Sequence, residues 1–344
     1  MSSVLAPKYT LTLGTQQWTD QLLRVELSLA AAPLIDCLEV RLPSSASPSA
    51  ETGDPVELSI DSGEDEEAVF TGTIGAIQRG FDYISVTALN AGGTLAQVRP
   101  AATYEQITAG SVVRSLCDDA GVDVGDLADG VSLVYYAADP GRTALEHIAR
   151  VCGWSGAMAR VSADNRVESV VVNATQAELA LLYGREVISF ESRKLPAPLA
   201  SFTVAGESAA SDSSAPEASR PTTDFFAGNR PTGPAADSRW RSEPALRTAE
   251  AAGTAGAALQ RVYNSSRERG GLKAWLQPKL RPGSIIEVQS LPDGMISGPL
   301  WVYRVRHTMS RRGAVTQASF YKGGDSFDPS ALLGSALSAI GGLL

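Results

Sequence analysis

The sequence predicts a mainly β protein in which two similar antiparallel β-domains flank a smaller α+β region. The first observation is a repeat, because a pattern of strands in residues 53–89 recurs in the same order in residues 283–321. The second observation is the residue pattern between the copies, where short apolar stripes at helical spacing occur next to short strands. Two copies so far apart indicate two like domains and not a solenoid.

Each copy begins with a glycine and continues with a strand, a turn and a second strand. In the first copy these are Gly53, 69–77, 79–82 and 83–89, and in the second they are Gly283, 301–309, 310–313 and 314–321. Two earlier segments alternate apolar and polar residues, as half-buried strands do. Their apolar positions are Val25, Leu27 and Leu29, and then Leu38, Val40 and Leu42. We therefore expect a compact antiparallel domain that ends near residue 92.

Two short helices and one strand are predicted between the copies. Val112, Val113 and Leu116 form an apolar stripe at helical spacing that ends at Gly121, a favourable residue for a C-cap. A second stripe of this kind follows residues 139–143, and a strand follows over residues 166–173. Helices this short and one-sided are expected to pack on small sheets.

Residues 206–243 interrupt the pattern, because Ser, Ala, Pro, Asp and Thr dominate them. Such a stretch does not bury enough apolar surface to fold alone, so we expect a long exposed loop. Phe225, Phe226 and Trp240 within it are either anchors for a neighbouring chain or contacts to their own domain. A helix over 244–263 is predicted next. The predicted domains are 1–95, 96–195, 196–325 with this loop and helix, and an apolar tail over 326–344.

The net charge of −9 argues against a general nucleic-acid binder. Residues 1–100 carry thirteen acidic and five basic side chains, whereas residues 261–323 carry eleven basic and three acidic ones. Two like domains of opposite sign are suited to pairing in a ring, although solvated surfaces also drift in charge. The candidate contacts between chains are Glu64, Asp65, Glu66 and Glu67 on the acidic side and Arg304, Arg306, Arg311 and Arg312 on the basic side.

The three cysteines, Cys37, Cys117 and Cys152, provide no disulfide framework, which indicates a reducing compartment. No stretch reaches the roughly 18 consecutive apolar residues of a membrane span. The N-terminal residues lack the basic start and apolar core of a signal peptide. We therefore expect a protein made in the cytoplasm, with no membrane anchor.

The sequence contains no recognisable catalytic, cofactor or metal site. His147 and His307 lie far apart, and Cys152 is off the predicted helical face of His147, which argues against zinc. The acidic run 64–67 is more typical of a solvated hairpin tip than of a carboxylate pair for acid/base chemistry. There is no P-loop or nucleophile elbow, and the Gly-Gly pairs lack the strand-to-helix setting of a dinucleotide site. We therefore expect neither catalysis nor a cofactor.

Four segments are informative together: Tyr136-x5-Arg142-Thr143-Ala144-Leu145-Glu146-His147-Ile148, Gly271-Leu272-Lys273, Lys279-Leu280-Arg281-Pro282-Gly283 and Val305-Arg306-His307. In this order, the chain resembles the baseplate hub family of contractile phage tails over roughly residues 5 to 325. The leucine-x-proline-glycine turn with the later valine-x-histidine strand is the most specific piece. This family includes the phage late-control protein D group and is related to the N-terminal part of type VI secretion spikes.

The resemblance implies two tube-like β-barrels per chain, three chains in a ring, and a pseudo-sixfold surface that joins a sixfold tail tube to a threefold spike. The implied partners are two further copies of the chain, a separate spike protein, the tail tube or its initiator, other baseplate proteins, and a tape-measure protein or cargo in the lumen. Two other classes stay open. One is a cell-wall hydrolase delivered by such a machine, and the other is a carbohydrate-binding β-module built on the tryptophans at 240, 275 and 301.

Two further expectations concern partner binding. Small and polar side chains of the hairpins are predicted to face the lumen, because side chains alternate across a strand. The candidates are Thr71, Thr73, Ser85, Thr87, Thr316 and Ser319. After Asp328 the chain has no charged side chain, and apolar residues recur at helical spacing, so this tail is predicted to dock the spike unless it is a frayed terminus. The docking candidates are Leu333, Leu337, Ile340 and Leu344.

Overall fold

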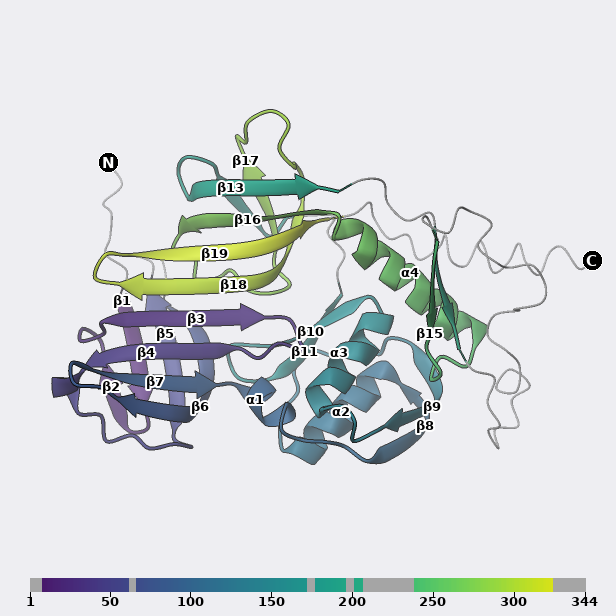
Figure 1. The fold of residues 1–344 in the computed structure, drawn as a ribbon, viewed down its shortest axis with the longest axis horizontal. Coiled ribbons are helices and arrows are strands. Elements are labelled where there is room, and N and C mark those ends of the chain that lie inside the picture. The colour runs from purple at the N-terminus through teal and green to yellow at the C-terminus, as the bar shows by residue number, and fades with distance from the viewer. Residues whose placement is uncertain (1–7, 62–65, 172–176, 196–200, 207–237, 324–344) are drawn as a thin grey trace, which may run out of the picture.

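The computed structural model describes residues 8–61, 66–171, 177–195, 201–206 and 238–323. The predicted class is confirmed: most of the described chain forms one large, mainly antiparallel sheet, and an α+β region lies at one end of it (Figure 1). The spike-docking candidates and most of the loop over 206–243 lie outside the described residues. No helix in the described part of the chain is long and apolar enough to cross a membrane.

Eight antiparallel strands form one continuous layer across the front of the molecule in Figure 1. Every neighbouring pair in this layer is hydrogen-bonded, including the pair β18 and β3 in its middle. In spatial order the strands are β13 (Val187–Lys194), β16 (Glu268–Trp275), β19 (Gly313–Lys322), β18 (Leu300–Ser310), β3 (Arg24–Ala30), β4 (Cys37–Pro43), β7 (Tyr83–Leu89) and β6 (Glu66–Arg79).

Shorter strands cover the back of this layer and close the core. Behind one half lie β5 (Pro55–Asp61), β1 (Lys8–Leu13) and β2 (Gln16–Trp18), and behind the other lie β17 (Ile285–Gln289) and β12 (Leu179–Leu182). One hydrophobic cluster extends through both halves, from Leu11 and Leu58 to Val302 and Phe320. Alternate residues of each front strand point into this cluster, which explains the period-two pattern of the sequence.

The internal repeat is confirmed by strand pairing. Copy 1 consists of β3, β4, β5, β6 and β7, and copy 2 consists of β13, β16, β17, β18 and β19. The pairings β3–β4, β4–β7, β7–β6 and β6–β5 of copy 1 correspond to β13–β16, β16–β19, β19–β18 and β18–β17 of copy 2. All eight pairings are antiparallel, so the two copies are the same five-stranded motif.

The glycines that open the two copies also have the same local structure. Gly53 and Gly283 adopt φ angles of 96° and 93°, which favour glycine. Each glycine N–H donates to the first strand of its hairpin, to Ile74 O at 2.8 Å and to Val302 O at 2.8 Å. The expected pair of separate barrels is modified in one respect: within the described residues the ladders do not close into two rings, because β18 and β3 join the copies edge to edge.

The α+β region packs around its own hydrophobic cluster at the right of Figure 1. Its helix α2 ends at Gly121 in a left-handed C-cap, as predicted, and α3 begins with a capping box between Thr143 and Glu146. Its elements are α1 (Ala91–Leu95), β8 (Ala102–Thr108), α2 (Ala109–Ala120), β9 (Ser132–Ala138), α3 (Ala144–Trp154), β10 (Ala157–Val161) and β11 (Val167–Val171).

Three elements from the middle of the chain extend the α+β region, the first and the last of them with residues in its cluster. They are β14 (Ser201–Ala205), β15 (Ser238–Ser242) and α4 (Ala249–Ser265), and a short 3-10 turn (Ser44–Ala46) lies elsewhere, after β4. The helix expected from residue 244 begins later, because the buried Glu243 pairs with Arg150 and Arg241, both at 2.6 Å, and Thr248 caps the first turn. Leu246, Ala252 and Ala255 pack with α3, so α4 shares the core of the α+β region.

Candidate functional site on the polar face of the sheet

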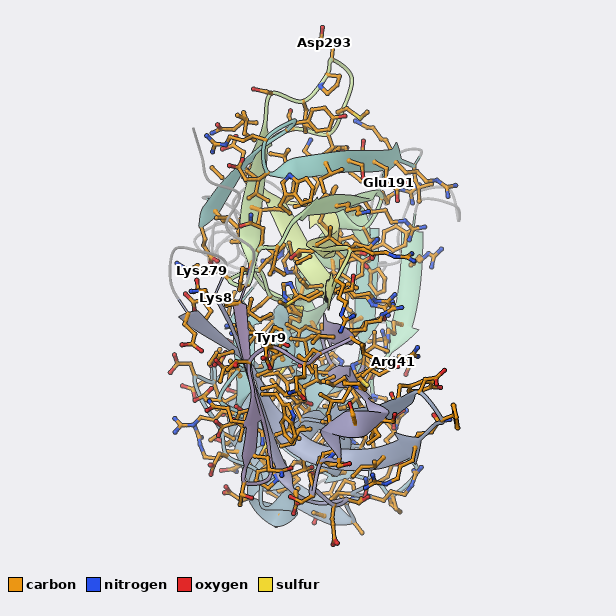
Figure 2. All side chains as sticks on the ribbon, turned by 90° about the vertical axis from the view of Figure 1, so that its left-hand side faces the viewer. Lys8, Tyr9, Arg41, Glu191, Lys279 and Asp293 are labelled. Atoms are coloured by element: carbon orange, nitrogen blue, oxygen red, sulfur yellow. The ribbon has the colours of Figure 1, made fainter. Side chains whose placement is uncertain are left out.

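The front layer presents a continuous polar face on the side opposite its core. The alternation of the strands directs alternate side chains to this face, which we define by Glu191, Lys273, Arg304, Arg306, Arg24, Glu26, Glu39 and Arg41, from β13 to β4. Figure 2 shows Arg41 and Glu191 on one side of the molecule and Lys8 and Lys279 on the other. Both copies therefore contribute to one surface.

Charged side chains pair with each other where the two copies join. Arg24 and Glu26 lie 2.5 Å apart, Arg41 and Glu39 2.9 Å apart, and Arg306 of copy 2 lies 3.4 Å from Glu26 of copy 1. All of these pairs are partly exposed, so each contributes about 0–1 kcal/mol and is weakened by salt. Their effect is to keep the junction of the copies polar and nearly charge-balanced.

The structure brings some of the predicted inter-chain candidates together and separates others. Arg304 and Arg306 lie on the polar face at the junction within the chain, and Arg311 and Arg312 are exposed in the turn between β18 and β19. Glu66 is exposed, and Glu67 lies 3.5 Å from Lys279 of copy 2. Glu64 and Asp65 lie outside the described residues. That these residues make contacts between chains stays a prediction.

Most of the predicted lumen residues lie on the side of the sheet away from the core. Thr71, Thr73, Ser85, Thr87 and Ser319 alternate with core residues such as Phe70, Val86 and Phe320. The prediction that Thr316 faces the lumen was wrong, because this residue is fully buried. It lies three positions from Ser319 and therefore on the opposite face, where its hydroxyl accepts a hydrogen bond from Gln277 N at 2.8 Å and lies 2.9 Å from His307 Nδ1.

The polar face also contains residues that sequence reasoning did not select. Glu39 and Arg41 on β4, and Glu191 and Lys273 in copy 2, project from it beside the predicted positions. The available signal was the alternation already seen for Leu38, Val40 and Leu42, since the residues between them face the other way. Glu191 and Lys273 had weaker signals, because neither β13 nor β16 was predicted as a strand.

Both histidines are core residues. Tyr136 Oη lies 2.6 Å from His147 Nδ1, and His147 Nε2 lies 3.0 Å from Asp139 O, so both ring nitrogens of His147 have partners. His307 is likewise buried. In the described ranges, no group of three or more His, Cys, Asp and Glu side chains is arranged to hold a metal ion. Trp301 is buried and Trp275 is exposed, so the tryptophans do not form the single platform that a carbohydrate-binding module needs.

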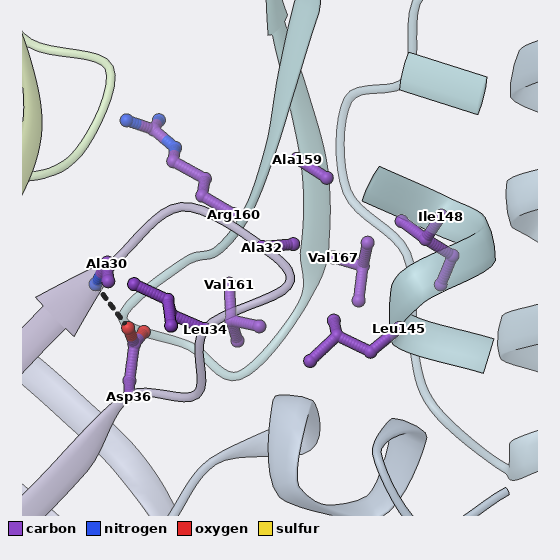
Figure 3. Close-up of a pocket in the computed structure, with 10 residues that line it drawn as sticks. All are labelled: Ala30, Ala32, Leu34, Asp36, Leu145, Ile148, Ala159, Arg160, Val161 and Val167. Carbon is purple, nitrogen blue, oxygen red and sulfur yellow. Dashed lines mark hydrogen bonds between the residues drawn. The ribbon is translucent and has the colours of Figure 1, made fainter. Parts of the chain in front are cut away.

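A small pocket lies where copy 1 meets the α+β region (Figure 3). Its lining is mostly apolar, from Ala32 and Leu34 to Leu145 and Ile148, with Asp36 and Arg160 at one side. Burial raises the pKa of Asp36 to about 7, against the hydrogen bonds that its carboxylate accepts from Ala30 N and Asn90 Nδ2, both at 2.7 Å. Asp36 is the only acid among the lining residues, whereas glycoside hydrolysis uses two carboxyl groups.

The leucine-x-proline-glycine turn connects three parts of the molecule. Arg281 in this turn donates a hydrogen bond to Ala68 O of copy 1 at 2.5 Å, and Arg160 of the α+β region donates to Pro282 O at 2.8 Å. A Cβ on Gly283 would lie 3.2 Å from Arg160 Nη1 and 3.3 Å from Met158 Cε. The motif therefore has a structural role, which is to fix the α+β region against both β copies.

We expect His307 to make the protein sensitive to acid. Burial lowers its pKa from 6.5 to about 4, so the unfolded chain binds the proton more strongly than the folded one. Its contribution to the free energy of unfolding is complete above about pH 6.5 and is lost as the pH falls towards 4, by up to about 3 kcal/mol. Urea unfolding of the wild type and His307→Leu at pH 7 and pH 4.5 measures this.

The comparison between the variant and the wild type is needed because Asp36 acts in the opposite direction. Its raised pKa gives stability at low pH that is lost as the pH rises towards 7. His307→Leu leaves the Asp36 contribution unchanged, so the deficit of the variant relative to the wild type should shrink from pH 7 to pH 4.5. A deficit that is equal at both pH values would contradict the assignment to His307.

Comparison with known proteins identifies the fold. No protein-family model matches the sequence, and no curated protein matches it. Among solved structures, a tail protein from Neisseria meningitidis superposes with a TM-score of 0.69 at 13% identity, over 94% of this chain and 98% of that one. The 43 kDa tail protein of prophage MuSo2 from Shewanella oneidensis gives a TM-score of 0.67 at 13% identity, over 92% and 98%.

A third structure comes from a secretion system. The E. coli c3393 protein, a component of the type VI secretion system with structural similarity to the bacteriophage tail proteins gp27 and gp5, superposes with a TM-score of 0.62 at 11% identity, over 93% of this chain and 79% of that one. At these identities the likeness shows a shared fold over nearly the whole chain.

Proposed function

We propose that this chain is the structural hub of a phage-tail-like contractile machine, a member of the late-control protein D group that acts without catalysis. In this role three copies form a ring that joins a sixfold tail tube to a threefold spike. The observation that carries the proposal is the eight-stranded layer built from two equal copies, because three such chains present six equivalent units around one axis. The shared fold with phage tail proteins supports the same role.

The dimensions of the layer fit a tube wall. Strands lie about 4.8 Å apart, so three eight-stranded layers side by side have a circumference of about 115 Å and a diameter of about 37 Å. With the polar face directed inward, the wall of the lumen carries paired charges and hydroxyl groups, together with the exposed ring of Trp275. A tape-measure protein or cargo would pass along such a surface without adhering to it.

The mass of the purified protein in solution tests this proposal. Analytical ultracentrifugation at micromolar concentration should give three times the mass of 36.0 kDa, and electron microscopy should show rings with a central opening. Binding of the rings to the tube and spike proteins of the same machine would then assign both ends. A protein that stays monomeric over this concentration range would overturn the trimeric hub.

We also propose that the uncharged tail over 329–344 docks the spike. Its apolar residues Leu333, Leu337, Ile340 and Leu344 recur at helical spacing in the sequence, and burying them would contribute several kcal/mol at about 25 cal/mol per Å². Deleting 329–344 should leave the trimer intact and weaken spike binding by about 100-fold or more, as measured by pull-down and calorimetry. Unchanged spike affinity of the truncated trimer would place the dock elsewhere.

A further inference from the structure

The loop between β3 and β4, residues 31–36, connects copy 1 to the core of the α+β region. The hydrophobic clusters of the β layer and of the α+β region are separate, but Ala32 and Ile35 of this loop pack against the second one. Ala32 N also donates a hydrogen bond to Ala159 O of β10 at 2.9 Å. Leu34 at the tip of the loop lines the pocket of Figure 3 and is 57% exposed, so the pocket adjoins solvent there.

Asp36 joins the two ends of this loop to the first helix of the α+β region. Its carboxylate accepts one hydrogen bond from Ala30 N, at the other end of the loop, and one from Asn90 Nδ2, both at 2.7 Å. Asn90 Oδ1 in turn accepts from Gly92 N at 3.0 Å and caps α1. One side chain therefore holds together the end of β3, the start of β4 and the start of the α+β region.

The carboxylate of Asp36 is buried among groups that do not neutralise it. Asp36 is 4% exposed, and both of its hydrogen-bond donors are neutral amide groups. Arg160 lines the same pocket, but its guanidinium pairs with Glu168 at 2.9 Å and donates to Pro282 O at 2.8 Å. An ionised carboxylate in such a place loses much of its solvation, which disfavours the charged form.

The other elements around Asp36 bring little charge to it. The turn before β17 contributes Arg281, whose charge favours the ionised carboxylate but is shared with other carboxylates nearby. Helix α3 contributes the apolar side chains of Leu145 and Ile148 to the pocket. Burial raises the pKa of the thiol of Cys37, the next residue in the chain, so this group stays neutral. Burial and the two hydrogen bonds therefore control the ionisation of Asp36.

The balance of these effects sets the direction of a pH dependence. Burial raises the pKa of Asp36 from 3.8 to about 7, so the carboxyl group in the closed junction is neutral below about pH 7 and ionised above it. A carboxyl group in contact with water ionises near its ordinary pKa, so ionisation favours every state in which water reaches Asp36. The stability that Asp36 gives to the closed junction is complete below about pH 3.8 and is lost as the pH rises to 7.

We propose that Asp36 is a pH-sensitive switch at the junction of copy 1 and the α+β region: the neutral group holds the β3–β4 loop and the start of α1 together, and the ionised group favours an open junction that admits water. The neutral carboxyl group keeps acceptor lone pairs for both N–H donors. The exposed Leu34 marks the side from which water enters. This equilibrium lies within one chain, so the inference does not rest on the proposed ring.

Hydrogen exchange at different pH values measures this switch in the full-length protein. Peptides that cover residues 30–36 and 90–96 should exchange about 10-fold faster at pH 8 than at pH 6, after correction for the intrinsic rate of exchange. The increase should level off above about pH 7, because the closed state is then ionised as well. Peptides from β18 should show no such change, since this strand lies in the middle of the β layer.

Three variants separate ionisation from packing. Asp36→Asn keeps the size of the side chain but does not ionise, so its corrected exchange should be the same at pH 6 and pH 8. Asn90→Ser keeps a residue that caps α1 but removes the donor to Asp36, so the midpoint of the increase should move to higher pH. Glu191→Gln, on β13 of copy 2, is the matched control and should behave like the wild type.

The outcomes distinguish a switch from a static buried carboxyl group. An increase in the wild type that is absent from Asp36→Asn supports the switch. Equal corrected exchange of the wild-type junction at pH 6 and pH 8 overturns it, as does an increase that persists in Asp36→Asn. If circular dichroism shows that Asp36→Asn does not fold, Asn90→Ser decides: a midpoint that moves to higher pH supports the switch, and an unmoved midpoint overturns it.

Discussion

Replacing Gly270 by alanine is expected to destabilise the protein by about 3 kcal/mol, the largest effect of any single methyl group in the β layer. A Cβ at this position would lie 2.0 Å from Glu191 O and 2.7 Å from Phe320 Cζ. Neither neighbour has room to move. The carbonyl belongs to the β13–β16 ladder, and the Phe320 ring stacks on Phe190 at 5.1 Å between centroids. The strand β13 would have to separate from the layer.

The adjacent glycine provides the control. A Cβ on Gly271 would lie 3.3 Å from Glu191 Oε1, the end of a flexible side chain, and 3.6 Å from Ala318 O. Gly271→Ala should therefore change the free energy of unfolding by less than about 1 kcal/mol. Chemical unfolding of both variants measures the difference. Equal stability of the two variants would show that β13 is free to shift at Gly270.

The Gly270 substitution should also affect assembly of the proposed ring, because β13 is the strand at one end of the eight-stranded layer. A variant that detaches β13 shortens the layer from which the proposed ring is built. We therefore expect Gly270→Ala to lower both the unfolding free energy and the fraction of trimer, whereas Gly271→Ala should preserve both. Both the stability of the chain and the assembly of the proposed ring would then depend on the packing of one strand, β13.

The sequence predicted those elements whose signals are local. The alternation of Val25, Leu27 and Leu29 indicated β3, and Gly121 indicated the end of α2. The two copies were recognisable because a glycine at positive φ and a hairpin are both short-range features. These signals extend over a few residues, so they need no knowledge of the remaining chain.

The features that were missed depend on contacts between distant segments. The β18–β3 junction connects residues near 28 with residues near 306, and no periodicity within either strand shows which edge meets which. Strand β13 was missed because Ser189, Glu191, Ser192 and Arg193 weaken its apolar pattern. An edge strand with so many polar residues is recognised only from its pairing with the neighbouring strand in the folded layer. Thr316 was misplaced for a related reason, since hydroxyl groups also occur on a buried face when they find partners.

Replacing Ser192 by proline is expected to abolish the trimer while it leaves the fold of the chain intact. The N–H of Ser192 points to the outer edge of β13, where proline removes a donor that no strand among the described residues uses. In the proposed ring, where the ends of the layers of neighbouring chains meet, the same change removes a main-chain donor from the contact between chains. Because the symmetry repeats the defect at all three contacts, self-association should weaken by at least about 100-fold.

Ser192→Thr is the matched control, because threonine keeps the N–H and favours extended backbone. Sedimentation should give monomers for Ser192→Pro and trimers for Ser192→Thr, and thermal unfolding should show that the isolated proline chain is still folded. The pair also separates the two roles of β13. Gly270→Ala acts on the inner edge, towards β16, and costs stability, whereas Ser192→Pro acts on the outer edge and costs only association. A proline variant that still forms trimers with unchanged affinity would show that the outer edge of β13 is not part of the contact between chains, and the ring would have to close through other residues.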